Sequence, residues 1–182
     1  MTQPNIFKLR NKINFMIERI LVLIKPDGLI KSLTGNIITV LSETKLKIVG
    51  AKVVKVTEEI ARKHYSELEP SLKKKFGEEK GKEVFKNIID YIQGKFHTDR
   101  VLALVYAGEN AIKKVREIAG ETNPEKAPPT TIRGKFGRIH SETTVFENVI
   151  HCSDSKENAE REIALWFKTS EVVDYKDRFG KD

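Results

Sequence analysis

Apolar residues along the chain follow strand and helix periods in turn. Residues 20–24 form a continuous apolar run, which is typical of a strand buried on both faces. Residues 47–56 alternate apolar and charged side chains and predict a half-exposed antiparallel strand, and residues 101–106 predict a third strand. Residues 148–151 predict the last strand, which delivers His151. The sequence therefore supplies four strands for one sheet.

Helical spacing of apolar residues separates these strands. We expect helices near residues 37–41, 57–68 (ending before Pro70), 84–92, 110–120 and 156–167, with Thr57 and Asn110 as N-caps. Residues 25–28 predict a turn, residues 72–82 a charged helical insertion, and residues 121–147 a long irregular stretch. This order of elements predicts an α+β sandwich, with one antiparallel sheet covered by helices.

Composition narrows the classes of protein. The 182 residues suit one domain, residues 16–182, preceded by an extension, residues 1–15, that lacks the pattern of a signal peptide. The net charge of +7 makes polyanions such as nucleotides or nucleic acid plausible partners. A single cysteine excludes an intrachain disulfide and agrees with a cytoplasmic location. No apolar run approaches the roughly 20 residues that cross a bilayer, so we expect no membrane partner.

His151 lies where the last strand meets a helix start. Ser153, Asp154 and Ser155 are preferred N-cap residues, and the free N–H groups of a helix N-terminus suit a phosphate. A neutral imidazole is also a nucleophile near pH 7. The alternative is a strand-end histidine satisfied by a carbonyl, and His64, His97 and His140 are interpreted in that way.

Other basic residues have similar alternatives. Lys25 ends a buried strand, where it either acts on a ligand or is simply solvated. Arg133 and its neighbouring threonines either bind phosphate or face solvent. Residues 77–83 nearly match a P-loop, but the spacing is one residue short and no Ser or Thr follows the lysine. We therefore interpret that segment as part of the charged helical insertion.

Four blocks, in order, resemble the nucleoside diphosphate kinase family from about Glu18 to Tyr175. They are Ile-Lys-Pro-Asp-Gly at 24–28, Gly-Glu-Thr-Asn-Pro at 120–124, Thr-Ile-Arg-Gly at 131–134, and residues 148–155 with the trailing Glu162 and Leu-Trp-Phe at 165–167. The resemblance implies a ferredoxin-like α/β sandwich with a four-stranded antiparallel sheet. It also implies transfer of the γ-phosphate from a nucleoside triphosphate to a nucleoside diphosphate through a phosphohistidine, with ping-pong kinetics.

The same resemblance implies a role for ten residues. His151 takes the phosphate, Ser153 and Glu162 orient the His151 ring, and Tyr65 packs beside the site. Substrate binding is assigned to Lys25, Arg116, Thr122 and Arg133 at the phosphates, Asn148 at the sugar hydroxyl, and Phe85 as the platform on which any base stacks. Mg²⁺ is expected to arrive with the nucleotide, because no His, Cys and carboxylate cluster has metal-ligand spacing. Family members are oligomers, commonly hexamers, built partly through the loop that carries Arg133.

The chain departs from the family pattern in several places. Cys152 stands where a glycine or alanine is usual, and its thiol could make the site sensitive to oxidation. Insertions lie around residues 73–82 and 138–145, and Glu147 replaces a commonly basic residue. A second interpretation is an RNA-binding module, since residues 133–137 (Arg-Gly-Lys-Phe-Gly) faintly resemble an RNA-recognition signature. Its spacing is broken, so the sequence favours the enzyme.

Overall fold

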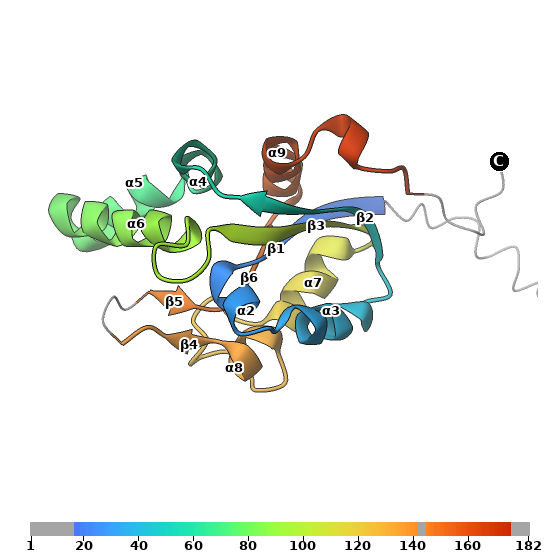
Figure 1. The fold of residues 1–182 in the computed structure, drawn as a ribbon, viewed down its shortest axis with the longest axis horizontal. Coiled ribbons are helices and arrows are strands. Elements are labelled where there is room, and N and C mark those ends of the chain that lie inside the picture. The colour runs from blue at the N-terminus through green and yellow to red at the C-terminus, as the bar shows by residue number, and fades with distance from the viewer. Residues whose placement is uncertain (1–16, 142–144, 176–182) are drawn as a thin grey trace, which may run out of the picture.

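A computed structural model describes residues 17–141 and 145–175, so the expected extension, residues 1–15, lies outside the described part. The elements, drawn in Figure 1, are β1 (Ile17–Ile24), α2 (Pro26–Ile30), α3 (Thr34–Ser42), β2 (Lys47–Lys55), α4 (Glu58–His64), α5 (Leu68–Phe76), α6 (Glu78–Ile92), β3 (Arg100–Glu109), α7 (Ala111–Ala119), α8 (Ile132–Phe136), β4 (Arg138–Ile139), β5 (Phe146–Glu147), β6 (Ile150–Cys152), α9 (Lys156–Trp166) and the 3₁₀ turn η2 (Thr169–Glu171). No helix in these two ranges is long and apolar enough to cross a membrane.

The four predicted strands form one antiparallel sheet in the order β2-β3-β1-β6. Strand β1 is central and pairs with both β3 and β6, and Leu23 lies opposite His151. Lys25 follows the end of β1 directly, so the pairing of β1 with β6 brings the Lys25 segment close to the His151 segment. The α+β sheet expected from the sequence is therefore confirmed.

Helices cover both faces of the sheet. On one face, Leu21 and Leu23 pack in a cluster with side chains of α4, α6 and α9. On the other face, Ile20, Val22 and Ile24 pack with side chains of α3 and α7. Figure 1 shows these two layers of helices on opposite sides of the strands. Burial on both faces explains why β1 is continuously apolar rather than alternating.

The helix around residues 57–68 differs from the prediction. Helix α4 ends at His64, and Pro70 lies in the first turn of the next helix, α5, rather than after a helix end. A proline is tolerated there because the first-turn N–H groups have no intrahelical partner. The insertion is helical, as predicted, and a Cβ on Gly81 would lie 2.5 Å from the Cα of Lys73. Close packing of α5 against α6 thus requires that glycine.

Two further local predictions were wrong, and a third holds only for the position of the residue. Residues 121–147 contain the short helix α8 and the β4–β5 ladder rather than irregular chain alone. The expected turn at residues 25–28 opens α2, with Pro26 at its start. Asn110 occupies the N-cap position of α7, as predicted, but it has a left-handed φ of 52° and its side chain makes no capping hydrogen bond. By contrast, Thr57 caps α4 and Ser155 caps α9 through their hydroxyls.

Candidate active site

The chain turns sharply at Val149, two residues before His151. Val149 has a φ of 56°, and the Ile150 N–H donates to the Asn148 carbonyl at 2.7 Å. A hydrogen bond between residues i and i+2 around a positive φ is the rare, strained form of the γ-turn. A buried, β-branched residue in that region is an outlier that the surrounding structure must enforce.

The segment at the end of β1 enforces this turn. The Asp27 carboxylate accepts the Val149 N–H at 2.8 Å, and the Lys25 N–H donates to the Val149 carbonyl at 2.9 Å. A Cβ on Gly28 would lie 3.0 Å from that same carbonyl oxygen. Asp27, fully buried, was not among the predicted site residues. Its signal in the sequence was its place in the Lys-Pro-Asp-Gly block.

Glu162 lies in contact with His151, the residue that the resemblance says it orients. His151 Nε2 lies 3.0 Å from Glu162 Oε2, and the Ser153 hydroxyl donates to the same oxygen at 2.7 Å. The Leu21 N–H in turn donates to Ser153 Oγ at 3.3 Å. Burial raises the pKa of Glu162, but the hydrogen bond and charge of His151 outweigh burial and leave that pKa below its usual value. The carboxylate is therefore ionised at neutral pH.

A second histidine packs against the first. The rings of His64 and His151 are 4.3 Å apart, edge to face, and Tyr65 stands 6.5 Å from His151. Trp166 Nε1 donates to His64 Nδ1 at 3.1 Å. Burial, and then repulsion from His151, lowers the pKa of His64 well below 6.5, so this ring stays neutral. The prediction that His64 is an ordinary histidine bonded to a carbonyl was wrong, because its Nδ1 accepts from the Trp166 indole and lies 3.9 Å from Glu162 Oε1.

Lys25 lies on the other side of the turn. Its ammonium donates to Asn148 Oδ1 at 2.8 Å and to the Phe146 carbonyl at 3.1 Å, and it sits 4.7 Å from the centre of the Tyr91 ring. Burial lowers the pKa of Lys25 to about 8, and nearby Asp27 opposes that shift. Asn148 also donates from Nδ2 to the carbonyl of exposed Thr122 at 2.8 Å.

Arg133 is buried and faces the backbone beside His151. Its guanidinium donates to the Gly120 carbonyl at 2.8 Å and to the Ile150 carbonyl at 3.2 Å, and it approaches Cys152 Sγ at 4.0 Å. Burial raises the pKa of the Cys152 thiol, while the charge of Arg133 opposes the rise. The thiol is both buried and protonated, so the structure does not favour the oxidation that the sequence suggested.

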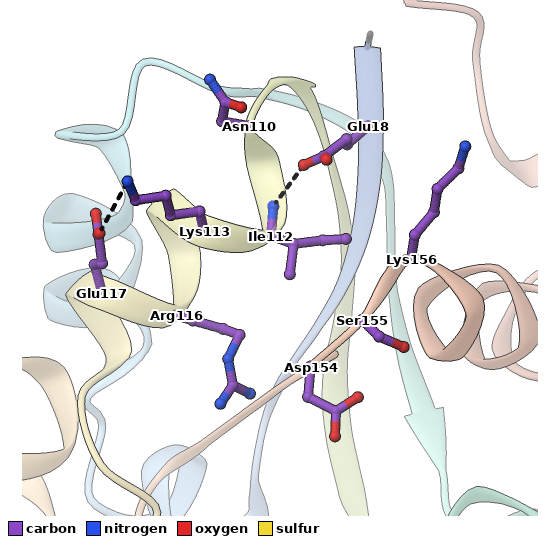
Figure 2. Close-up of a pocket in the computed structure, with 9 residues that line it drawn as sticks. All are labelled: Glu18, Asn110, Ile112, Lys113, Arg116, Glu117, Asp154, Ser155 and Lys156. Carbon is purple, nitrogen blue, oxygen red and sulfur yellow. Dashed lines mark hydrogen bonds and ion pairs between the residues drawn. The ribbon is translucent and has the colours of Figure 1, made fainter.

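Arg116 opens onto a neighbouring pocket of about 500 Å³. Figure 2 shows it on α7, with its guanidinium directed toward the side of the pocket where Asp154 and Ser155 lie. No hydrogen bond or ion pair holds its guanidinium among residues 17–141 and 145–175. The structure thus brings Arg116 near the segment that follows His151, with its charge available.

Phe85 is the one substrate-binding prediction that the structure contradicts. The residue is 3 % exposed and packs in the core beside Ile89 and Ile92, with the Arg62 guanidinium 5.9 Å from its ring. No face of the ring is free for a nucleotide base. The face of α6 that carries Phe85 is turned toward the sheet, so the role assigned across the first insertion is corrected to a core residue.

One group of ligand atoms meets only in the folded chain. His64, His151 and Glu162 bring one ligand atom each within 4.8 Å of the others, a spacing that could hold a metal ion. However, His64 Nδ1 already accepts from Trp166, and Glu162 Oε2 is shared between His151 and Ser153. The trio is best explained as the hydrogen-bond network that fixes the His151 ring.

Comparisons with known proteins agree with this geometry. The family model described as nucleoside diphosphate kinase matches residues 18–172. The nucleoside diphosphate kinase of Pyrococcus furiosus is 43% identical over 159 residues, which cover 87% of this chain and 88% of the relative. That of Staphylococcus epidermidis is 41% identical over 160 residues, covering 88% and 94%.

Solved structures give the same result. A transition state mimic of the Borrelia burgdorferi nucleoside-diphosphate kinase, with bound vanadate and ADP, has a TM-score of 0.74 and 33% identity, covering 89% of this chain and 94% of that one. The Halobacterium salinarum nucleoside diphosphate kinase in complex with CDP has a TM-score of 0.73 and 34% identity, covering 90% and 95%.

The fold, the oriented histidine and these comparisons define a phosphotransferase. The chain belongs to the nucleoside diphosphate kinase family. The reaction is transfer of the γ-phosphate of a nucleoside triphosphate to a nucleoside diphosphate, by the family's ping-pong route through a phosphohistidine.

Proposed function

We propose that His151 is the residue that carries the phosphate, and that Nδ1 is the attacking atom. The observation that carries this proposal is the 3.0 Å contact between His151 Nε2 and Glu162. An ionised carboxylate can only accept, so Nε2 bears the ring proton and Nδ1 keeps its lone pair. Nδ1 has no hydrogen bond to any residue in the two described ranges, which leaves it free to attack.

The two half-reactions then follow from this tautomer. Nδ1 forms a bond to the γ-phosphorus as the bond from phosphorus to the bridging oxygen breaks, and the nucleoside diphosphate leaves with that electron pair. The positive charge that develops on the imidazole is stabilised by Glu162. In the second half, a terminal oxygen of another diphosphate attacks the phosphorus, and the P–N electron pair returns to Nδ1.

The cationic residues are proposed to hold the phosphates. Lys25 uses two of its three ammonium donors on Asn148 and the Phe146 carbonyl, which leaves one for a phosphate oxygen. Arg133 donates to the Gly120 carbonyl and to the Ile150 carbonyl beside the turn, and Arg116 has a guanidinium nearby that no residue in the described part of the chain pairs. We assign Thr122 to the same phosphate-binding set and Asn148 to the sugar hydroxyl. Vanadate and ADP bound to the Borrelia burgdorferi relative support a site of this kind.

Mg²⁺ is proposed to come with the nucleotide. The ligand trio of His64, His151 and Glu162 offers two imidazoles, whereas Mg²⁺ prefers oxygen ligands, so the trio does not fit that ion. Carried on the phosphates, Mg²⁺ would neutralise part of their negative charge. The residues of this chain then need to bind only the remaining charge.

Assembly and location are further parts of the proposal. Ile48 and Val53 on the edge strand β2 are 45% and 64% exposed, which supports burial against another copy of the chain. We propose a homo-oligomer, most simply the hexamer common in the family, and light scattering on the purified protein measures its mass. The single cysteine supports a reducing compartment such as the cytoplasm.

The RNA-binding alternative loses support from the fold. An RNA-recognition domain presents an open sheet face with aromatic residues, whereas helices cover both faces of this sheet. Residues 133–137 lie in and after helix α8 rather than on a strand.

Labelling with γ-phosphate-labelled ATP, without acceptor, tests the proposal. The wild-type chain should retain about one acid-labile, base-stable phosphate and release it as triphosphate when any nucleoside diphosphate is added. His151→Ala should take up no label, whereas His140→Ala, the histidine control, should label normally. A label that survives acid, or that forms on His151→Ala, would assign the nucleophile to another residue.

A further inference from the structure

Glu147 has an unusual setting for a carboxylate. Its side chain is completely buried, yet two cations, Lys31 and Arg138, and the His97 ring surround it. Lys31 Nζ lies 3.0 Å from Oε2, His97 Nε2 lies 2.7 Å from Oε1, and Arg138 Nε donates to Oε2. A buried charge is tolerated only when it is paired in this way.

The partners of Glu147 tie three segments together. Lys31 is the C-cap residue directly after α2, His97 precedes β3, and Arg138 opens β4. Glu147 itself belongs to β5, in the loop that leads to the strained turn at Val149. The carboxylate therefore fixes this loop against both the end of α2 and the segment after α6.

The neighbours of Glu147 in the chain both bind Lys25. The Phe146 carbonyl and the Asn148 side chain accept the two hydrogen bonds of the Lys25 ammonium, at 3.1 and 2.8 Å. Each acceptor is thus one residue from the anchored carboxylate. A shift of the Glu147 backbone would move both acceptors, and the ammonium would follow.

We propose that Glu147 is a positioning residue for phosphoryl transfer: bound to Lys31, His97 and Arg138, it holds the two acceptors that place the Lys25 ammonium. This inference rests on the proposed role of Lys25 at the phosphates. It assigns a function to the position where the chain departs from the basic residue common in the family.

Charge acts in the same direction as geometry. Burial lowers the pKa of Lys25. The carboxylates of Asp27 and Glu147 raise that pKa, whereas the charges of Arg133 and Lys31 lower it. The Tyr91 ring also faces the ammonium. Burial raises the pKa of Glu147 itself, but Arg138, Lys31 and His97 bring it down to about 2, so the carboxylate is charged at working pH. Removing that charge lowers the pKa of Lys25 further, and the ammonium is then lost at a lower pH.

Glu147→Gln is the decisive variant, because it keeps the shape and removes the charge. We expect the first-order rate of His151 phosphorylation by saturating ATP to fall by about ten- to a hundredfold, the range for a misplaced catalytic group. The alkaline limb of kcat/KM should also move to lower pH, and Glu147→Asp should restore part of the rate. Wild-type kcat with an unmoved alkaline limb in Glu147→Gln would overturn the inference.

Asp90→Asn is the matched control. Asp90 is a largely buried carboxylate bound by Lys86 at 2.6 Å and Lys95 at 2.5 Å, so its loss also breaks an ion-pair cluster. Both variants should unfold at lower temperature, but only Glu147→Gln should shift the pH limb. An equal loss of rate and an equal shift in Asp90→Asn would reduce Glu147 to a structural role and overturn the inference.

Lys25→Met separates this inference from the proposed function. If Lys25→Met transfers phosphate at the wild-type rate, the role of Lys25 fails and the inference fails with it. If Lys25→Met is slow and Glu147→Gln is not, only the inference fails.

In the double variant, adding Glu147→Gln to Lys25→Met should slow transfer little further, because both substitutions act through one ammonium. If Glu147→Gln does not fold, Arg138→Gln, which removes one exposed partner, should lower kcat in the same direction, and an unchanged kcat would overturn the inference.

Discussion

The Asp27 carboxylate accepts the backbone N–H of Val149 at 2.8 Å, across 122 residues of sequence, and thereby holds a residue with a φ of 56° in place. The same residue's carbonyl accepts from the Lys25 N–H. The end of β1 thus clamps the strained turn that delivers His151. The backbone strain lies at Val149, whereas the hydrogen bonds that offset it come from Lys25 and Asp27, far away in the sequence.

Asp27→Ala should destabilise the protein and slow phosphorylation of His151. It leaves a buried N–H without an acceptor, which costs about 1–3 kcal/mol of unfolding free energy. Asp27→Asn keeps an acceptor oxygen, so its unfolding free energy and its rate should lie closer to the wild type. Urea unfolding and single-turnover labelling measure both quantities. Equal stability of Asp27→Ala and wild type would mean that the turn needs no clamp.

Substitutions at Val149 should reverse the usual order of stability, in which an alanine variant is more stable than a glycine variant. Alanine at a positive φ is strained by about 1–2 kcal/mol, whereas glycine adopts this conformation freely. Val149→Gly should therefore be at least as stable as Val149→Ala in urea unfolding. At Val115, buried in α7 with an ordinary helical backbone, glycine should be the less stable of the two by about 1 kcal/mol. The same order at both positions would show that the turn relaxes when the valine is removed.

Because of Lys25, activity should fall and the free energy of unfolding should rise as the pH becomes alkaline. The pKa of Lys25 falls from 10.5 to about 8 in the folded chain. Below 8 the lysine is protonated in both states, and folding bears the cost of burying the charge. Between about 8 and 10.5 the unfolded chain binds more protons, so stability gains from Lys25 as the pH rises. Activity needs the ammonium, so kcat/KM should fall above about pH 8.

Lys25→Met should lack the alkaline gain in unfolding free energy and lose most of its activity at all pH values. Lys52→Met, on β2 and bound to Glu171, should keep both pH dependences. Denaturant unfolding at several pH values, beside the kinetic pH profile, checks the pair. A stability gain that persists in Lys25→Met would assign the titration to another group.

Phe85→Ala should act on stability rather than on nucleotide selection. Truncation of a buried phenylalanine costs about 3–5 kcal/mol of unfolding free energy. Phe85→Leu should keep most of the stability and leave KM unchanged for ATP, GTP and CTP. A uniform rise in KM for all three nucleotides in a stable Phe85→Leu protein would restore the base-stacking role and contradict the core assignment.

The sequence by itself determined the four strands, most of the helices and the family, because these depend on local periodicity and on contiguous blocks. Lys25, Asn148, His151, Ser153 and Glu162 were all named from such blocks. Each block has a defined place in one fold, so matching the block was enough to place its residues.

Only the tertiary structure decided which side chains face one another. Phe85 illustrates the limit for a helix, because one position along α6 turns a side chain by about 100°, and packing against the sheet alone selects the buried face. His64 and Glu147 illustrate it for long-range contacts: their partners His151 and Lys31 lie 87 and 116 residues away. Burial keeps His64 neutral, and the ion-pair partners of Glu147 keep it charged, and both are properties of the packed chain rather than of any segment.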